Sequence, residues 1–132
     1  MTNPNYLHTE VTEKIIKAFY KVYNTLGYGF LEKVYERAML IELRKMEMKC
    51  SNQLKIEVFY EGENVGDYFA DINVEEKIII ELKSVDTLIE DHEQQLVNYL
   101  KATTYEVGLL LNFGPKPQVK KRVFTNDYKN NL

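Results

Sequence analysis

The segment at residues 77–85, KIIIELKSV, constrains the fold of this 132-residue chain more than any other stretch. Residues 78–80 form an unbroken apolar run, which is typical of a strand buried on both faces of a sheet. The run leads directly into Glu81 and Lys83, so a carboxylate and an ammonium group stand at the end of an apolar strand. The segment therefore predicts a central strand with charged side chains at one end.

The other segments divide into helices and strands by the spacing of their apolar residues. Helical spacing predicts one helix that is capped by Thr9 or Thr12 and stops at Gly27, and two more at residues 30–46 and 88–102. Alternating or short apolar runs predict strands at residues 54–60, 65–74, 77–85, 105–113 and 118–124.

The element order ααβββαββ predicts one domain over residues 1–132, of the α+β (mixed α/β) class, with a central mixed β-sheet flanked by helices. The helix at 88–102 is expected to cross over between two parallel strands. The termini, residues 1–8 and 125–132, are expected to be loose. On the second helix, the apolar side is expected to consist of Leu31, Val34, Tyr35, Ala38, Met39 and Ile41.

Composition narrows the class of protein. The net charge of −3 argues against a protein that coats nucleic acid, because such proteins are usually basic. No apolar run approaches the roughly 20 residues of a membrane helix, and the first residues do not resemble a signal peptide. With Cys50 as the single cysteine, we expect a cytoplasmic protein that does not contact membranes and has no internal disulfide.

Asp71 lies ten residues before Glu81, on the strand expected to pair with residues 77–85. Glu81 and Lys83 are two residues apart on a strand, so their side chains share one face of the sheet. If the intervening loop has three residues, 75–77, Asp71 lies opposite Glu81 with Cβ atoms about 4.5–5.5 Å apart. A two-residue loop would move Asp71 toward the other face. The alternative is an ordinary Glu81–Lys83 ion pair, with Asp71 solvated.

Two carboxylates this close repel each other, and burying them is costly unless a cation compensates their charge. Mg²⁺ prefers oxygen ligands and is often held by one or two carboxylates with water and substrate phosphate. Asp71 and Glu81 are therefore candidate ligands for Mg²⁺ or Mn²⁺. Lys83 would orient the attacking water or stabilise the charge of a phosphate.

The spacing Asp71…Glu81-x-Lys83 is similar to the PD-(D/E)XK nuclease signature, with Ala70 where proline often stands. Four blocks, GYGFLEKVYERAMLIEL, ADINVEEKIIIELKSV, HEQQLVNYLKAT and VGLLLNFG, resemble the GxxExxxY proteins, a bacterial and archaeal family placed in that nuclease superfamily. The likeness covers residues 10–125. The tyrosine after Glu32 comes one residue early for the family name, so Tyr35 receives no role.

The resemblance implies a restriction-endonuclease-like core of order αβββαβ, which fits this chain with one extra helix before it and one extra strand after it. It also implies that Glu32, on the first core helix, supports the metal. Gln95 and Tyr99, on the helix after the Glu-x-Lys strand, would face the site, with Gln95 steadying Lys83 or a phosphate. The alternatives are an acid favoured by the helix dipole for Glu32, and an amphipathic helix edge for Gln95 and Tyr99.

A basic segment near the C-terminus contains Lys116, Lys120, Lys121 and Arg122. These side chains are candidates for weak phosphate contacts. A basic edge strand that discourages aggregation is an equal explanation.

Three functions remain open at this point. The first is a Mg²⁺-dependent phosphodiesterase that hydrolyses the nucleic-acid backbone, with DNA favoured over RNA. The second is a catalytically weak or silent nuclease-fold module that binds nucleic acid or protein. The third is a nucleotide- or tRNA-processing hydrolase with the same chemistry. Analogy with the fold also allows a homodimer that covers a duplex.

Overall fold

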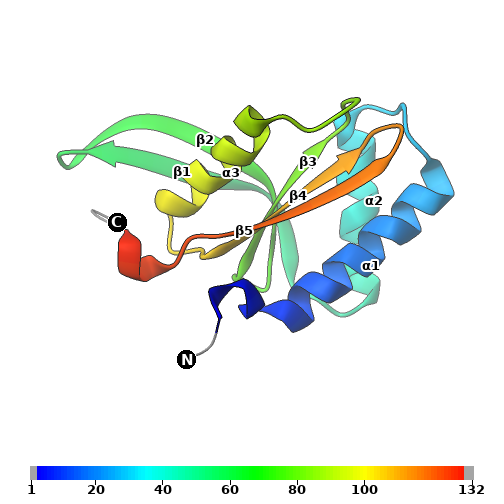
Figure 1. Cartoon of the computed structure of the whole chain (residues 1–132), viewed down its shortest axis with the longest axis horizontal. Coiled ribbons are helices and arrows are strands. Elements are labelled where there is room, and N and C mark those ends of the chain that lie inside the picture. Colours follow the sequence, from blue (N-terminus) through cyan, green and yellow to red (C-terminus); the bar gives the residue numbers. More distant parts are fainter. Residues whose placement is uncertain (1–2, 130–132) are drawn as a thin grey trace.

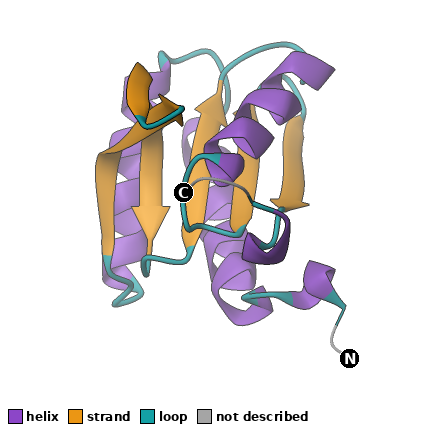
Figure 2. Ribbon diagram, turned by 90° about the vertical axis from the view of Figure 1, so that its left-hand side faces the viewer, coloured by secondary structure: helices purple, strands orange, loops and turns teal. Residues whose placement is uncertain are grey.

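The computed structural model describes residues 3–129, which form one five-stranded sheet with helices on both faces (Figures 1 and 2). The helices and strands are α1 (Thr9–Leu26), α2 (Glu32–Lys45), β1 (Cys50–Tyr60), β2 (Glu63–Val74), β3 (Ile78–Lys83), α3 (Glu90–Lys101), β4 (Val107–Phe113) and β5 (Pro117–Val123). Two short 3₁₀ helices, η1 (Pro4–Tyr6) and η2 (Asn126–Tyr128), flank them. The predicted order ααβββαββ and the α+β class are confirmed.

The strands lie in the order β1-β2-β3-β4-β5, so the apolar run of β3 is central, as predicted. All neighbouring strands are antiparallel except β3 and β4, which are parallel and are joined through α3. Helices α1 and α2 cover one face of the sheet and share one apolar cluster with it, and α3 covers the other face over a second apolar cluster. Both faces of β3 are therefore buried, because Ile78 and Ile80 pack toward α1 and α2 while Ile79 packs toward α3.

The loop between β2 and β3 sets the register of the central hairpin. Val74 lies opposite Ile78, which confirms the three-residue loop 75–77. Glu75 and Glu76 have positive φ angles of 54° and 53°, and Lys77 N donates to Val74 O over 2.9 Å to close the turn. This register carries Asp71 toward Glu81 on the adjoining strand.

The β1–β2 hairpin changes its orientation halfway along its length. Gln53, opposite Asp71, has a φ angle of 56°, which is rare inside a strand. On one side of this bend Ile72 packs under α1 and α2, and on the other side Ala70 and Ile56 pack under α3. The outer half of the hairpin therefore projects beyond the body of the domain, as Figure 1 shows.

The prediction for the buried side of α2 was partly wrong. Leu31, Val34 and Ile41 are 81%, 39% and 58% exposed. Instead, the inward face contains Tyr35, Glu36, Met39, Leu40 and Leu43. The Tyr35 ring stacks on Phe113 of β4 at 4.0 Å between centroids, and its hydroxyl donates to Gly27 O over 2.8 Å. These long-range contacts set the rotation of the helix.

The start of α1 also differs from the prediction. The N-cap residue is His8, with a φ angle of 54° and no side-chain cap bond. The Thr9 hydroxyl donates to Tyr6 O, and the Thr12 hydroxyl donates to Thr9 O, so neither threonine caps the helix. The predicted end at Gly27 is confirmed, since its φ angle is 69° and its N–H donates to Tyr23 O.

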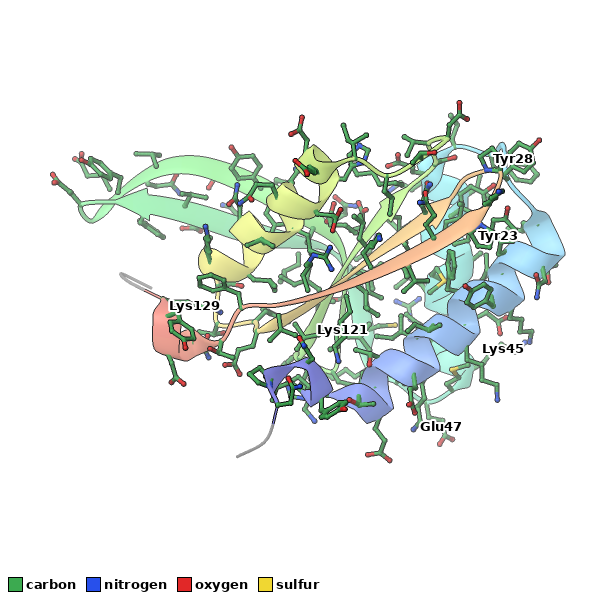
Figure 3. All side chains as sticks on the ribbon, in the orientation of Figure 1. Tyr23, Tyr28, Lys45, Glu47, Lys121 and Lys129 are labelled. Carbon is green, nitrogen blue, oxygen red and sulfur yellow. The ribbon has the colours of Figure 1, made fainter. Side chains whose placement is uncertain are left out.

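The described parts of the two termini are tied to the sheet by lysine side chains, both labelled in Figure 3. Lys121 Nζ donates to Asn5 O and Leu7 O, each over 2.9 Å. Lys129 Nζ donates to the carbonyl oxygens of Thr103 and Tyr105. The expectation of loose termini otherwise falls on residues 1–2 and 130–132, which lie outside the described residues. Within residues 3–129, no helix has both the length and the apolar character needed to cross a bilayer.

Candidate functional site

Two acidic side chains interlock where β2 and β3 separate. The strands pair from Val74–Ile78 to Ile72–Ile80, and beyond that point side chains replace the backbone ladder. Asp71 N donates to Glu81 Oε1 over 3.0 Å, and Leu82 N donates to Asp71 Oδ2 over 2.7 Å. Each carboxylate therefore accepts an amide from the opposite strand, which holds Asp71 and Glu81 side by side.

This acidic pair lies in an unfavourable electrostatic environment. Burial, and then the charge of Asp71, raise the pKa of Glu81 from 4.5 to about 8. Burial also raises the pKa of Asp71, and the negative charges of Glu36 and Glu32 add to this effect. Near neutral pH the pair therefore lacks the positive charge needed for both groups to ionise.

Lys83 supplies part of that positive charge. It is the last residue of β3 and is half-buried. Because it lies two residues after Glu81 on the strand, its side chain points to the same face of the sheet. Its ammonium group opposes the rise in pKa of both Asp71 and Glu81. Lys83 takes part in none of the ion pairs found within residues 3–129. The structure thus brings together the three residues of the Asp71…Glu81-x-Lys83 pattern.

Helix α2 brings two more acids toward the pair. Glu32 is the first residue of the helix and is exposed, and its charge raises the pKa of both Asp71 and Glu81. One turn later, Glu36 is only 4% exposed and was not singled out from the sequence. The one sequence signal for it was its position directly after Tyr35 and one helical turn after Glu32.

Glu36 is held by three donors from two elements. Its carboxylate accepts from Lys33 Nζ over 3.0 Å, from Asn52 Nδ2 over 3.2 Å and from Gln53 Nε2 over 2.8 Å. Gln53 is the residue at the bend of β1 opposite Asp71. Glu36 therefore joins α2 to the strand bend beside the acidic pair.

Helix α3 contributes a hydrogen-bonded pair on the face that covers Glu81. Gln95 Nε2 donates to Tyr99 Oη over 2.6 Å. Burial raises the pKa of Tyr99, and the charges of Glu81 and Asp71 raise it further, so the phenol lies within electrostatic range of the acidic pair. His92 accepts a hydrogen bond from Ile89 N through Nδ1 at the start of α3.

Two hollows adjoin these residues. One, of about 450 Å³, includes Glu32 and Ser84 and lies at the ends of β3 and β4. The other, of about 840 Å³, lies between α3 and the outer half of the β1–β2 hairpin and includes Gln95 and Tyr99. Glu32 thus lines one hollow and Gln95 and Tyr99 line the other, whereas Asp71, Glu81 and Lys83 line neither.

The basic segment has mixed surroundings. Lys121 is committed to carbonyl oxygens of the N-terminal segment, and Arg122 forms an ion pair with Glu93 and donates to Lys121 O. Lys116 and Lys120 are exposed. These two side chains are the more accessible part of the segment.

The donor set suits a hard divalent cation. One oxygen of each carboxylate accepts a backbone amide, which leaves Asp71 Oδ1 and Glu81 Oε2 for other ligands. Within residues 3–129, no group of three or more His, Cys, Asp or Glu side chains is arranged to hold a metal ion. Mg²⁺ needs only one or two carboxylates when water and phosphate complete its coordination, so the pair fits this ion.

Comparison with known proteins gives a family match that includes all the strands and helices of the site. The family model described as the PD-(D/E)XK nuclease superfamily matches residues 9–123. The crystal structure of SSO0001 has a similar fold, with a TM-score of 0.55 and 18% identity over 70% of this chain and 50% of that chain. This chain thus spans about half the length of SSO0001, and the likeness concerns the fold alone. No curated protein matches the sequence significantly.

Proposed function

The chain belongs to the PD-(D/E)XK nuclease superfamily, and on that premise we propose that it is a metal-dependent phosphodiesterase that hydrolyses the nucleic-acid backbone, DNA in preference to RNA. Within the superfamily, the four sequence blocks favour the GxxExxxY proteins. The observation that carries the proposal is the interlocked pair of Asp71 and Glu81 with Lys83 beside it. The nuclease signature and the geometry therefore point to the same three side chains.

In this proposal Asp71 and Glu81 hold Mg²⁺ or Mn²⁺, with Glu32 in support from the start of α2. The ion, when bound, would acidify a water molecule and neutralise charge on the phosphate. The two backbone amides that anchor the carboxylates fix their direction, so little ordering is required on binding.

Lys83 and the α3 pair would act on the substrate. Lys83 would orient the attacking water and stabilise the negative charge that develops on the phosphate. Gln95, fixed by its bond to the Tyr99 hydroxyl, would steady Lys83 or a phosphate oxygen. Lys116 and Lys120 would add weak contacts to the backbone farther away.

The test is a cleavage assay on supercoiled plasmid and on single-stranded DNA in Mg²⁺ or Mn²⁺. We expect Lys83→Ala to lower the rate about 100- to 10,000-fold, the usual range for loss of a group that transfers or orients a proton. Lys17→Ala is the matched control, because Lys17 is an exposed lysine on α1. Equal rates for Lys83→Ala and the wild type would contradict the proposed role.

A second function has its own supporting observation. Because each acid accepts a backbone amide of the other strand, Asp71 and Glu81 can stabilise the central hairpin without a metal. A nuclease fold that is catalytically weak or silent, and that binds nucleic acid or protein, would retain the pair for this reason. Normal folding and DNA binding, with no cleavage by the wild type in Mg²⁺ or Mn²⁺, would favour this module.

We also propose a cytoplasmic location and, from analogy with the fold, a homodimer on duplex substrates. Sedimentation of the free protein and of its complex with a duplex would test the second point. A monomer in both samples would contradict it.

A further inference from the structure

A groove of about 840 Å³ lies between α3 and the projecting half of the β1–β2 hairpin, with Gln95 and Tyr99 in its lining but without Asp71, Glu81 or Lys83. Its volume lies within the range of about 300–1,000 Å³ typical of ligand sites. Figure 1 shows the outer end of the β1–β2 hairpin reaching past α3. The groove therefore has room for a ligand.

The hairpin wall of the groove is aromatic and exposed. Phe59 and Tyr68 are 50% and 48% exposed, and Val65 is 62% exposed. A shift of register between Val58 and Phe59 marks a β-bulge, which brings both of these consecutive side chains to the groove. Exposed aromatic rings on a concave wall of a small domain indicate a binding surface.

The α3 wall presents amide groups instead of charges. Gln94, Gln95 and Asn98 line it, and Gln94 Nε2 donates to Asn98 Oδ1 over 2.9 Å. The charged side chains in the lining are Glu57, Asp91 and Lys101, so the wall is not basic. Amides offer both donors and acceptors, which suits the edges of nucleobases better than phosphate groups.

The groove reaches the candidate active site through Tyr99, whose phenol lies within electrostatic range of Glu81 and Asp71. Gln95 and Tyr99 belong to its lining and cover the face of the sheet that carries Glu81. The Tyr68 ring lies 5.8 Å from the Tyr99 ring, which joins the hairpin wall to the helix wall at that end. A strand whose phosphate reaches the acidic pair would thus lie next to the groove.

We propose that this groove binds an unpaired DNA strand next to the phosphate to be cleaved, with bases stacked on Phe59 and Tyr68 and their edges bonded to the α3 amides. The proposal rests on the function proposed above. Aromatic rings can stack only on bases whose faces are free, and a duplex buries those faces between neighbouring base pairs. The substrate class is therefore DNA with single-stranded stretches, such as flaps, gaps or tails.

The test measures binding apart from cleavage. Fluorescence anisotropy with the full chain in EDTA would compare a labelled single-stranded 12-mer of mixed sequence, the same strand as RNA, and the corresponding DNA duplex. We expect the single DNA strand to bind at least about tenfold more tightly than the duplex. Each phosphate contact on a single strand adds a slope of roughly −0.7 to the plot of log affinity against log salt concentration. Since the groove lining has few cations, we expect a slope smaller in size than several such contacts would give.

The variants are chosen on one hairpin. Phe59→Ala and Tyr68→Ala should each weaken single-strand binding by about 5- to 100-fold. Tyr60→Ala is the matched control, because Tyr60 is 67% exposed beside Phe59 but does not line the groove; its affinity should stay within about twofold of the wild type. Gln94→Ala, on exposed α3 surface, is a second groove variant that does not touch the hairpin.

The groove proposal is overturned if duplex and single strand bind equally, or if the groove variants bind like Tyr60→Ala. Tighter binding of the RNA strand would overturn the choice of DNA. If Phe59→Ala cleaves duplex plasmid at the wild-type rate, the nuclease function is retained and the groove is not needed for it. If the groove binds single-stranded DNA but the wild type cleaves no DNA in Mg²⁺ or Mn²⁺, the proposed nuclease function is refuted and the groove proposal is not.

Discussion

At the scale of single residues, Asp71 and Glu81 have two opposed properties. Backbone amides from the opposite strand stabilise both carboxylates, while burial raises both pKa values. The charge of Asp71 raises the pKa of Glu81 further, and nearby acids on α2 do the same for Asp71. A group whose folded-state pKa is raised binds its proton more tightly in the native state. Its contribution to stability is complete below the ordinary pKa and is lost as the pH rises through the folded pKa.

Glu81→Gln tests this electrostatic strain. Without metal, we expect the wild type to lose of the order of a few kcal/mol from the Glu81 contribution as the pH rises from about 4.5 to about 8. The variant keeps an acceptor for Asp71 N but has no charge, so it should be more stable than the wild type at pH 8 and differ little at pH 5. Urea denaturation in EDTA at both pH values measures the difference. A difference that does not change with pH would refute the raised pKa.

Much of this local arrangement could be predicted from the sequence. The apolar run of β3 indicated a central strand, and a three-residue loop, which the structure confirms, places Asp71 in line with Glu81. Glu36 could not be predicted in the same way. Acids on helices are usually solvated, and only its contacts with Lys33, Asn52 and Gln53 explain its burial.

At the scale of secondary-structure elements, long-range contacts decide which helix faces are buried. Helix α2 has apolar residues on more than one side, and local periodicity favoured a stripe containing Leu31, Val34 and Ile41. Tyr35 belongs to this stripe, but its stacking on Phe113, 78 residues away, turns the buried face toward Leu40 and Leu43. The bend of β1 at Gln53 was likewise invisible to pattern analysis, because a glutamine at positive φ leaves no signal in the alternation of apolar residues.

Glu36→Ala tests whether α2 holds the strand bend. Removing the carboxylate breaks its hydrogen bonds to Lys33, Asn52 and Gln53. Because hydrogen bonds to a charged group contribute more than neutral ones, we expect a loss of about 1–3 kcal/mol in the free energy of unfolding. Glu32→Ala is the control, because that side chain is exposed, and its effect should stay within about 0.5 kcal/mol. Urea denaturation of both variants would decide, and equal effects would mean that Glu36 does not stabilise the bend.

Gly108→Ala tests how closely α3 packs on β4. A Cβ atom at Gly108 would come within 2.6 Å of Leu96 Cδ1, and Leu96 is fully buried. We expect a loss of about 1–3 kcal/mol from overpacking. At Gly66, a Cβ atom would meet Tyr68 at an ordinary 3.4 Å. Gly66→Ala should therefore destabilise the protein less than Gly108→Ala when the thermal unfolding of both variants is measured. A larger loss of stability in Gly66→Ala would contradict the packing described for α3.

At the scale of the whole molecule, the sheet and its two helical layers carry one acidic site on a chain of net charge −3. The formal charges of Glu32, Asp71 and Glu81 sum to −3, so the positive and negative charges of the other residues cancel. Nonspecific attraction to the phosphate backbone should accordingly be weak. Substrate binding would depend on the metal, on Lys83 and on the groove beside α3, in place of a broad basic surface.

The most direct test of the central claim is calorimetric titration of the protein with Mg²⁺ at pH 7, in two buffers of different ionisation enthalpy. We predict one ion bound per chain and, because the pKa of Glu81 is about 8, a proton released on binding that makes the heat depend on the buffer. Asp71→Asn, which keeps an acceptor for Leu82 N, should abolish binding. A wild-type protein that binds no Mg²⁺ or Mn²⁺ at millimolar concentrations would contradict the claim that Asp71 and Glu81 form a metal site.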